Sequence, residues 1–391
     1  MTIVKLNNIC QKYEIKVVYF TPGKIAPYHL ARFAKLAEVY SRLSVVNVIW
    51  EDDHRWENDF GELADRIVVI GERREEMSDK EKCRAVIGFL DNLEPEVIVL
   101  AGYNDPTQIA AARWARKNGA IRILHADSWQ GDHPRYWLKE LIKRRFFVQP
   151  NFDAAFVPGL LGYQYVRSLG IPEKAIWRGL YVVDNDYFAQ GAAAARQDEV
   201  AVRSGLGLAH NYFLTVTRLS SEKNLLRLLQ AYDRYRRLGG GWDLVVVGAG
   251  PQEKELREFA ASRMGAGVLF AGWGDYEKLP AYYALARCFV LPSISEPWGL
   301  VVNEAMACGL PVLVSRKCGC FPELCHRGIN GFDFDPLDVA ELTELFLRAS
   351  GGTLDLKVLG QASIRMISGF TLDTWVQALT DCIGTTICNK R

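Results

Sequence analysis

The stretch SEPWGLVVNE at residues 295–304 carries the pattern from which both fold and site can be read. It places two carboxylates, Glu296 and Glu304, eight positions apart, with a Pro-Trp-Gly turn between them and a helical apolar pattern from Gly299 onward. The first backbone N–H groups of a helix are unpaired and lie at the positive end of its dipole, so a helix start can hold a phosphate. Glu296 precedes that start, and Glu304 follows it by one to two turns. The pattern therefore favours a ligand with hydroxyl groups at both ends and a diphosphate in the middle, such as a nucleotide-sugar.

This segment resembles the E-x7-E motif of retaining GT-B glycosyltransferases, especially family 4 (glycosyl transferases group 1), and further matches extend over nearly the whole chain. The resemblance implies that Glu296 contacts the transferred sugar and that Glu304 binds the ribose hydroxyls. It also implies that the amides of Gly299, Leu300 and Val301 hold the distal phosphate. Without the resemblance, Glu304 would be a helix-start residue favoured by the dipole, and Glu296 a solvated loop residue.

Size and composition favour a soluble, two-domain protein. A chain of 391 residues is too long for one ordinary core. The formal net charge of +1 gives no global field that would attract nucleic acid. Neither a bilayer-crossing apolar run nor the apolar core of a secretion signal is evident, and nine cysteines fit free thiols in a reducing compartment. We therefore expect a cytoplasmic protein that binds no nucleic acid.

Apolar runs alternate with helical patterns along the chain, which indicates parallel sheets covered by helices on both faces. The pattern breaks near residue 184, a polar, Ala-rich stretch follows to about residue 203, and the alternation then restarts. Before the break, the predicted strands are 15–20, 45–50, 66–70, 97–100, 121–124 and 154–157. After it, they are 213–216, 243–247, 268–270, 288–291 and 311–314.

The fold class predicted is α/β, with two Rossmann-like doubly wound domains that face a central cleft, as in GT-B proteins. Residues 1–183 would form the acceptor-side domain and residues 184–372 the nucleotide-sugar-binding domain. Residues 373–391 are predicted to form a helix, and the resemblance implies that this helix returns to the first domain.

Two cations follow the predicted strand 213–216 at its junction with a helix. Arg218 and Lys223 could converge on one anion and neutralise a departing diphosphate. They resemble the family's R-L-x-x-x-K segment, which holds the donor phosphates, although surface cations are more commonly solvated.

The glycines of the next motif, Gly248 and Gly250, permit close backbone approach. Glu253 occupies the position of the third glycine in the dinucleotide-binding fingerprint. The two glycines therefore fit a loop that lines a nucleotide site (a nucleotide wall) better than an NAD site.

The remaining candidates rest on the resemblance. Gly272 and Trp273 correspond to the loop that lies beside the nucleotide base in the family. Trp273 could stack on that base, or it could pack against other side chains of the protein. Gly23 and Tyr28 belong to the loop after the first strand, which faces donor phosphate and acceptor in the family. His125 and Asp127 follow the strand 121–124. His125 is our candidate for contacting the sugar and Asp127 is the nearby acceptor-side carboxylate; a satisfied core histidine is the competing interpretation.

The segment 135–147 is basic and aromatic at helical spacing. It could rest on an anionic membrane surface and bring the enzyme, as a peripheral protein at the inner face of the membrane, to a lipid-linked acceptor. The alternative is a helix packed on its own sheet, with its cations extended into solvent.

Three other kinds of site fit these residues less well. The cluster Cys318, Cys320, Cys325 and His326 has the wrong spacing for structural zinc. The acidic runs 184–186 and 51–53 resemble a D-x-D metal site, which would need the donor in the first domain; the run 184–186 fits a hinge better. A glycosidase would use paired carboxylates but not the two cations.

The function predicted is a retaining, metal-independent, hexosyltransferase-type glycosyltransferase that needs no cofactor. Its donor would be a nucleoside diphosphate sugar and its acceptor a saccharide, lipid-linked or small-molecule hydroxyl, in polysaccharide or glycoconjugate biosynthesis. Glu296, Arg218, Lys223 and His125 are the candidate catalytic residues. A sugar-nucleotide epimerase of similar architecture and a non-catalytic nucleotide-sugar-binding protein are the alternatives.

Overall fold

The computed structural model describes residues 14–22, 25–48, 60–70 and 77–390. Gly23 and the acidic run 51–53 lie outside these ranges. The chain divides into two compact units, and each contains its own parallel sheet. The first unit holds the residues up to Gln130, then Pro134–Tyr181 and the segment from Leu372 onward, whereas the second holds Gly131–His133 and Val182–Thr371. The α/β class predicted from the alternation of strands and helices is confirmed.

The first unit is built on a seven-stranded sheet of order β3-β2-β1-β4-β5-β6-β7. All of its pairings are parallel, and the order reverses at β1, between β2 and β4. Such a reversal opens a crevice at the carboxyl ends of the strands, which is where ligands bind in doubly wound sheets. The strands are β1 (Val17–Pro22), β2 (Leu43–Val48), β3 (Ile67–Ile70), β4 (Val97–Leu100), β5 (Ile121–His125), β6 (Ala154–Val157) and β7 (Ile176–Arg178).

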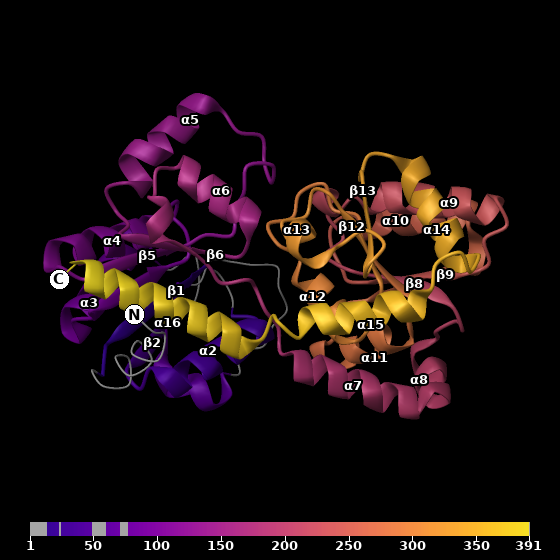
Figure 1. Ribbon diagram of the computed structural model, residues 1–391, viewed down its shortest axis with the longest axis horizontal. Coiled ribbons are helices and arrows are strands. Elements are labelled where there is room, and N and C mark those ends of the chain that lie inside the picture. The colour runs from indigo at the N-terminus through magenta and orange to yellow at the C-terminus, as the bar shows by residue number, and fades with distance from the viewer. Residues whose placement is uncertain (1–13, 23–24, 49–59, 71–76, 391) are drawn as a thin grey trace. The chain divides into compact units, whose positions relative to one another are not determined.

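Helices cover both faces of this sheet (Figure 1). On one face α16 lies beside α2, and α16 also contacts β5, β6 and β7. On the other face α3, α4 and α6 enclose a continuous apolar core. No helix in the described ranges is long and apolar enough to cross a bilayer. The helices are α2 (Pro27–Val39), α3 (Asp79–Leu93), α4 (Pro106–Asn118), α5 (Trp137–Ile142), its π-helical continuation η2 (Lys143–Val148), α6 (Leu160–Ser168) and α16 (Leu372–Lys390).

The second unit has a six-stranded parallel sheet of order β10-β9-β8-β11-β12-β13. Its strands are β8 (Tyr212–Val216), β9 (Asp243–Val247), β10 (Val268–Gly272), β11 (Cys288–Leu291), β12 (Val312–Ser315) and β13 (Gly331–Phe334). One face carries α9 (Leu225–Arg237), α10 (Glu253–Arg263) and α14 (Val339–Ser350). The other carries α7 (Asn185–Gln197), α8 (Glu199–Leu206), α11 (Leu279–Leu285), α12 (Leu300–Ala307) and α15 (Leu356–Ile367).

The chain passes from the first unit to the second between Tyr181 and Val182, close to the run 184–186, and a hinge there stays a prediction. Asp184 is the N-cap of α7, and its Oδ1 accepts a hydrogen bond of 3.0 Å from the backbone N–H of Tyr187. The Ala-rich stretch that follows forms α7 and α8, because alanine has the highest intrinsic helix propensity. Strands β7 and β13 were not predicted. Strand β7 is only three residues long, which leaves too little pattern to recognise, and β13 has a glycine and an aspartate among its four residues.

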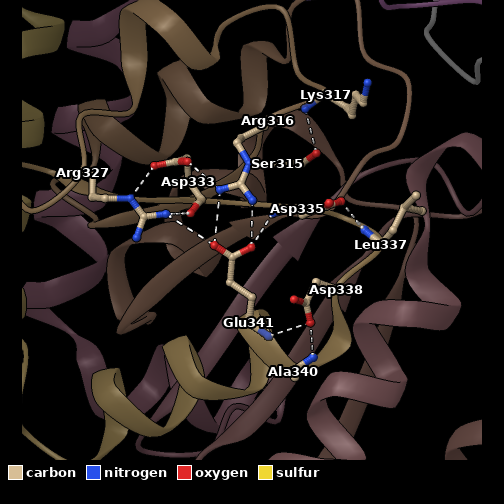
Figure 2. A network of polar contacts seen from close by, with 10 residues as sticks. All are labelled: Ser315, Arg316, Lys317, Arg327, Asp333, Asp335, Leu337, Asp338, Ala340 and Glu341. Carbon is tan, nitrogen blue, oxygen red and sulfur yellow. Dashed lines mark hydrogen bonds and ion pairs between the residues drawn. The ribbon is translucent and has the colours of Figure 1, made fainter.

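A network of ion pairs joins β12, the edge strand β13 and α14 (Figure 2). One carboxylate oxygen of Asp333 accepts a hydrogen bond of 2.9 Å from Arg316 Nη1, and the other accepts one of 2.8 Å from Arg327 Nε. Glu341 accepts a hydrogen bond of 2.9 Å from Arg316 Nη2 and one of 2.7 Å from the backbone N–H of Asp335. Burial alone would raise the pKa of Asp333, but the hydrogen bonds from Arg327 and Arg316 outweigh it and lower the pKa. The network therefore ties the last strand of the sheet to the helix that follows it.

Asp333→Asn should lower the free energy of unfolding of this unit by about 1 kcal/mol at pH 7, a modest value because both arginines are partly solvated. The pKa of Asp333 is depressed, so its contribution is present above the ordinary aspartate pKa and is lost as pH falls through the folded-state pKa. Urea unfolding at pH 7 and at pH 3 would measure both values. Glu344→Gln, on the exposed face of α14, is the control and should change stability by less than about 0.5 kcal/mol. An Asp333→Asn effect that is equal at the two pH values would contradict the assignment.

Candidate active site

The helix start that the sequence predicts after Glu296 is present at α12, and phosphate binding there stays a prediction. Gly299 is its N-cap, with φ of 102°, a left-handed conformation that strains residues with a side chain. A Cβ on Gly299 would also lie 2.8 Å from Leu291 Cδ2. Because Gly299 has no side chain, it cannot cap the first-turn amides, and the half-buried Leu300 and Val301 follow directly. The helix start is therefore suited to an external anion.

Glu296 and Lys223 form a largely buried ion pair. Lys223 Nζ lies 2.7 Å from Glu296 Oε2, and the two side chains are 16% and 13% exposed. Ser293 Oγ donates to the same oxygen at 3.3 Å. The two predicted catalytic residues are separated by 73 positions, and the loops after β8 and β11 bring them together.

Arg218 lies in the same loop as Lys223 and is exposed. Burial tends to raise the pKa of Glu222, but its hydrogen bond from Ser220 and the charges of Lys223 and Arg218 together lower it. Both cations thus act on one small region at the carboxyl end of β8. This is the side of the sheet at which α12 begins.

Gly248 and Gly250 pack against the backbone of that cationic loop. A Cβ on Gly248 would lie 1.9 Å from the carbonyl oxygen of Thr217, and one on Gly250 would lie 2.5 Å from that of Leu219. The N–H of Leu219 donates to the carbonyl of Ala249 at 3.0 Å. The close backbone approach that the sequence predicted is therefore made within the chain itself, and a nucleotide wall at these glycines stays a prediction.

The loop after β10 is joined to the same region. The carbonyl of Gly272 accepts a hydrogen bond of 2.7 Å from the N–H of Gly248, and Gly272 has φ of 76°. Trp273 follows and is half-buried. Stacking of Trp273 on a base stays a prediction.

Glu304 lies in the second turn of α12 and is 5% exposed. Tyr283 Oη, on α11, donates to Glu304 Oε2 at 2.7 Å. Burial raises the pKa of Glu304 to about 7, and the hydrogen bond from Tyr283 opposes that rise. Nothing in the sequence pointed to Tyr283, because an apolar-looking helix position gives no sign of a polar partner 21 residues away.

In the first unit, His125 is enclosed by side chains that the sequence did not single out. Its Nδ1 is hydrogen-bonded to Tyr19 Oη, and the ring of Trp375 on α16 lies 6.5 Å from the imidazole. Burial, with a further contribution from the Arg32 charge, lowers the pKa of His125 to about 3. His125 is therefore neutral at physiological pH, and its buried Nε2 has no hydrogen-bond partner among the described residues.

The acceptor-side candidates lie near this group. Arg32 is 3% exposed; its guanidinium lies 5.2 Å from the ring of Tyr28 and 4.8 Å from that of Tyr181. Asp127 is exposed, and its charge acts on Tyr19 and Tyr181. Contact of His125 with a sugar, and of Asp127 or Tyr28 with an acceptor, stay predictions.

The buried thiols do not form a metal site. Burial raises the pKa of Cys318, Cys320 and Cys325, which disfavours the thiolate form that a metal would need. No group of three or more His, Cys, Asp or Glu side chains is gathered as a metal site within the described ranges. The C-x-C segment instead packs on the loop before α12, where Gly319 N–H donates to the Glu296 carbonyl at 2.9 Å.

The segment that carries this geometry is similar in sequence to known proteins. Residues 197–361, which include Arg218, Lys223, Glu296 and Glu304, match the family described as glycosyl transferases group 1. The chain is 34% identical over 242 residues to a GDP-mannose-dependent phosphatidylinositol monomannoside mannosyltransferase of Mycolicibacterium smegmatis; the match covers 59% of this chain and 61% of that protein. It is 37% identical over 250 residues to the glycogen synthase of Mycobacterium tuberculosis, covering 56% and 58%. The matches thus span about three fifths of these relatives.

Structural similarity to known proteins covers more of this chain than sequence similarity does. A glycosyltransferase structure from Rickettsia africae covers 96% of this chain and all of its own, with a TM-score of 0.75 and 12% identity. The structure of Anabaena HepE in complex with UDP covers 95% of this chain and all of its own, with a TM-score of 0.73 and 17% identity. The chain therefore has the GT-B fold, and residues 197–361 of its second unit match the glycosyl transferases group 1 family.

A double-mutant cycle tests the buried pair. Lys223→Met and Glu296→Gln should each cost about 2–3 kcal/mol in the free energy of unfolding of the second unit, since each leaves its partner buried and unpaired. The double variant should cost clearly less than the sum, with a coupling of about 1–2 kcal/mol. The exposed pair Lys254–Glu258, at 4.0 Å, is the matched control and should couple by less than about 0.5 kcal/mol. Additive effects at residues 223 and 296 would show that the pair is not formed in solution.

Proposed function

We propose that this protein is a retaining, metal-independent glycosyltransferase that moves a sugar from a nucleoside diphosphate to an acceptor hydroxyl in polysaccharide or glycoconjugate biosynthesis. The observation that carries the proposal is the Lys223–Glu296 pair at the carboxyl edge of the sheet from which α12 begins. A cation, a carboxylate and unpaired helix amides are the groups that a sugar diphosphate requires. The family match over residues 197–361 supports the same conclusion.

In the mechanism that we infer, Lys223, Arg218 and the first amides of α12 stabilise negative charge on the departing diphosphate. These groups supply the charge neutralisation that a divalent cation supplies in other transferases, which is why we infer a metal-independent reaction. The diphosphate competes with Glu296 for Lys223. Glu296 is then able to accept hydrogen bonds from the sugar and orient it, while Glu304 binds the ribose. Retention would follow from front-face attack assisted by the leaving phosphate.

The donor and the acceptor are proposals of the same kind. The Mycolicibacterium smegmatis relative uses GDP-mannose, and Anabaena HepE was crystallised with UDP-glucose, so GDP- and UDP-sugars are the first donors to test. An epimerase would convert the donor without an acceptor, and a binding protein would turn over nothing. The family match over residues 197–361 favours neither alternative.

Lys223→Ala should lower kcat for sugar transfer by about 10²–10³, because one preorganised charge at the leaving group is lost. The measurement is release of nucleoside diphosphate from GDP- and UDP-sugars in the presence of an acceptor mixture. Lys357→Ala, an exposed lysine on α15, should leave the rate unchanged. A fully active Lys223→Ala enzyme, or donor conversion without acceptor, would contradict the proposal.

We also infer that the exposed surface of α5 and η2, called the α5 surface below, contacts an anionic membrane as a peripheral site on the cytoplasmic side. Trp137 is 78% exposed and Phe146 is 65% exposed, and no residue of α5 is buried. Exposed cations lie among the apolar side chains, a composition suited to an anionic lipid surface. The exposed apolar side chains are Tyr136, Trp137, Leu138, Leu141, Ile142 and Phe146, and the exposed cations are Lys139, Arg144 and Arg145.

The double variant Trp137→Ser/Phe146→Ser should abolish co-sedimentation with vesicles that contain phosphatidylglycerol, and its thermal melting should be unchanged. Val200→Ser/Val358→Ser removes two exposed apolar residues elsewhere and is the matched control. Wild-type protein should bind weakly to purely phosphatidylcholine vesicles and lose anionic-vesicle binding in high salt. Equal sedimentation of the test and control variants would contradict a role for this surface.

A further inference from the structure

The contact between Tyr283 and Glu304 fixes one oxygen of a buried carboxylate. Tyr283 is fully buried on α11, and its hydroxyl donates to Glu304 Oε2 at 2.7 Å. Among the described residues, this is the hydrogen bond that the carboxylate receives. Because one oxygen is held from α11, the rotation of the carboxylate is restricted and its second oxygen is oriented as well.

The groups that face Glu304 from neighbouring elements carry no positive charge. They are Tyr283 on α11, Tyr276 just before α11, Tyr187 on α7 and Cys308 at the end of α12, and each feels the Glu304 charge. The guanidinium of Arg196, on α7, donates to the carbonyls of Ala284 and Cys308. Burial without a cation makes ionised Glu304 costly, and the Tyr283 hydrogen bond offsets part of that cost.

We propose that Tyr283 is a positioning residue that presents the Glu304 carboxylate to the donor ribose, and that donor binding releases a proton from this pair to solvent. The proposal rests on the function proposed above, in which Glu304 binds the ribose hydroxyls. Hydroxyl groups of the nucleotide donate to the ionised carboxylate, so the bound state favours Glu304 without its proton. A protonated carboxyl group has fewer acceptor positions and binds the nucleotide less tightly.

The sign of the pH dependence follows from burial. The folded-state pKa of Glu304 is raised to about 7, so the donor-free protein is increasingly protonated as pH falls below 7. Nucleotide affinity should therefore fall by about tenfold between pH 8 and pH 6. Tyr283→Phe removes the hydrogen bond that lowers this pKa. Its affinity should be weaker at pH 7 and should recover at higher pH, while kcat at saturating donor changes by less than about twofold.

Calorimetric titration with UDP-glucose, GDP-mannose and ADP-glucose between pH 6 and pH 9 tests this, because the phosphates of these nucleotides do not titrate in that range. Two buffers of different ionisation enthalpy let the released protons be counted. We expect about half a proton to be released at pH 7 by wild-type protein, and the pH midpoint of Tyr283→Phe to lie higher. Tyr282→Phe, the adjacent residue whose hydroxyl does not contact Glu304, should behave as wild type. Glu304→Gln should bind without proton release, and it keeps the test decisive if Tyr283→Phe does not fold.

Each outcome separates the two proposals. Binding of a nucleoside diphosphate sugar without proton release, or an unchanged midpoint in Tyr283→Phe, would overturn the Tyr283 assignment and leave the proposed transferase standing. Failure of all three nucleotides to bind at any pH would overturn both.

Discussion

Backbone-to-backbone packing of the loops at the carboxyl edge of the second sheet is the constraint on which the site depends. Gly248 and Gly250 let the loop after β9 lie against the carbonyls of Thr217 and Leu219. On the other side of β8, Gly319 lies so close to Pro297 that a Cβ would be 1.7 Å from its carbonyl oxygen. No residue with a side chain fits at these positions without moving a loop. The loops that carry Lys223 and Glu296 are therefore held at fixed places, which allows one ion pair to join them.

Burial sets the chemistry of these loops and of α12. Glu296 is paired with a cation, whereas the hydrogen-bond partner of the buried Glu304 among the described residues is a tyrosine, so two carboxylates of one motif have different environments. A buried pair is costly to desolvate, and the cost is offset when the partners meet at short distance. The donor-free protein thus keeps its own carboxylate on the lysine that we expect to bind phosphate. Glu304, by contrast, has a pKa that burial raises to about 7, so its carboxyl group is partly protonated at physiological pH.

The two units relate differently to known proteins. The family match lies within the second unit, whereas likeness of fold extends over nearly the whole chain. The first unit carries its own cluster of Tyr19, His125 and Trp375, in which the histidine is kept neutral. A neutral imidazole can orient a ligand through a hydrogen bond, and its low pKa argues against its acting as a general base. This cluster joins residues of the first strand, the fifth strand and the last helix, so no local pattern could have revealed it.

The sequence by itself determined the class of the fold and named the candidate residues of the site. Alternating apolar runs placed most strands within a few residues, and the spacing of Glu296, Gly299 and Glu304 identified a helix start, because these are periodic or local signals. Only the tertiary structure decided what each candidate touches. It paired Lys223 with Glu296, placed Tyr283 on Glu304, buried His125, and made Asp184 a helix cap. These depend on segments that are distant in sequence, and burial and loop packing, which fix them, are properties of the whole fold.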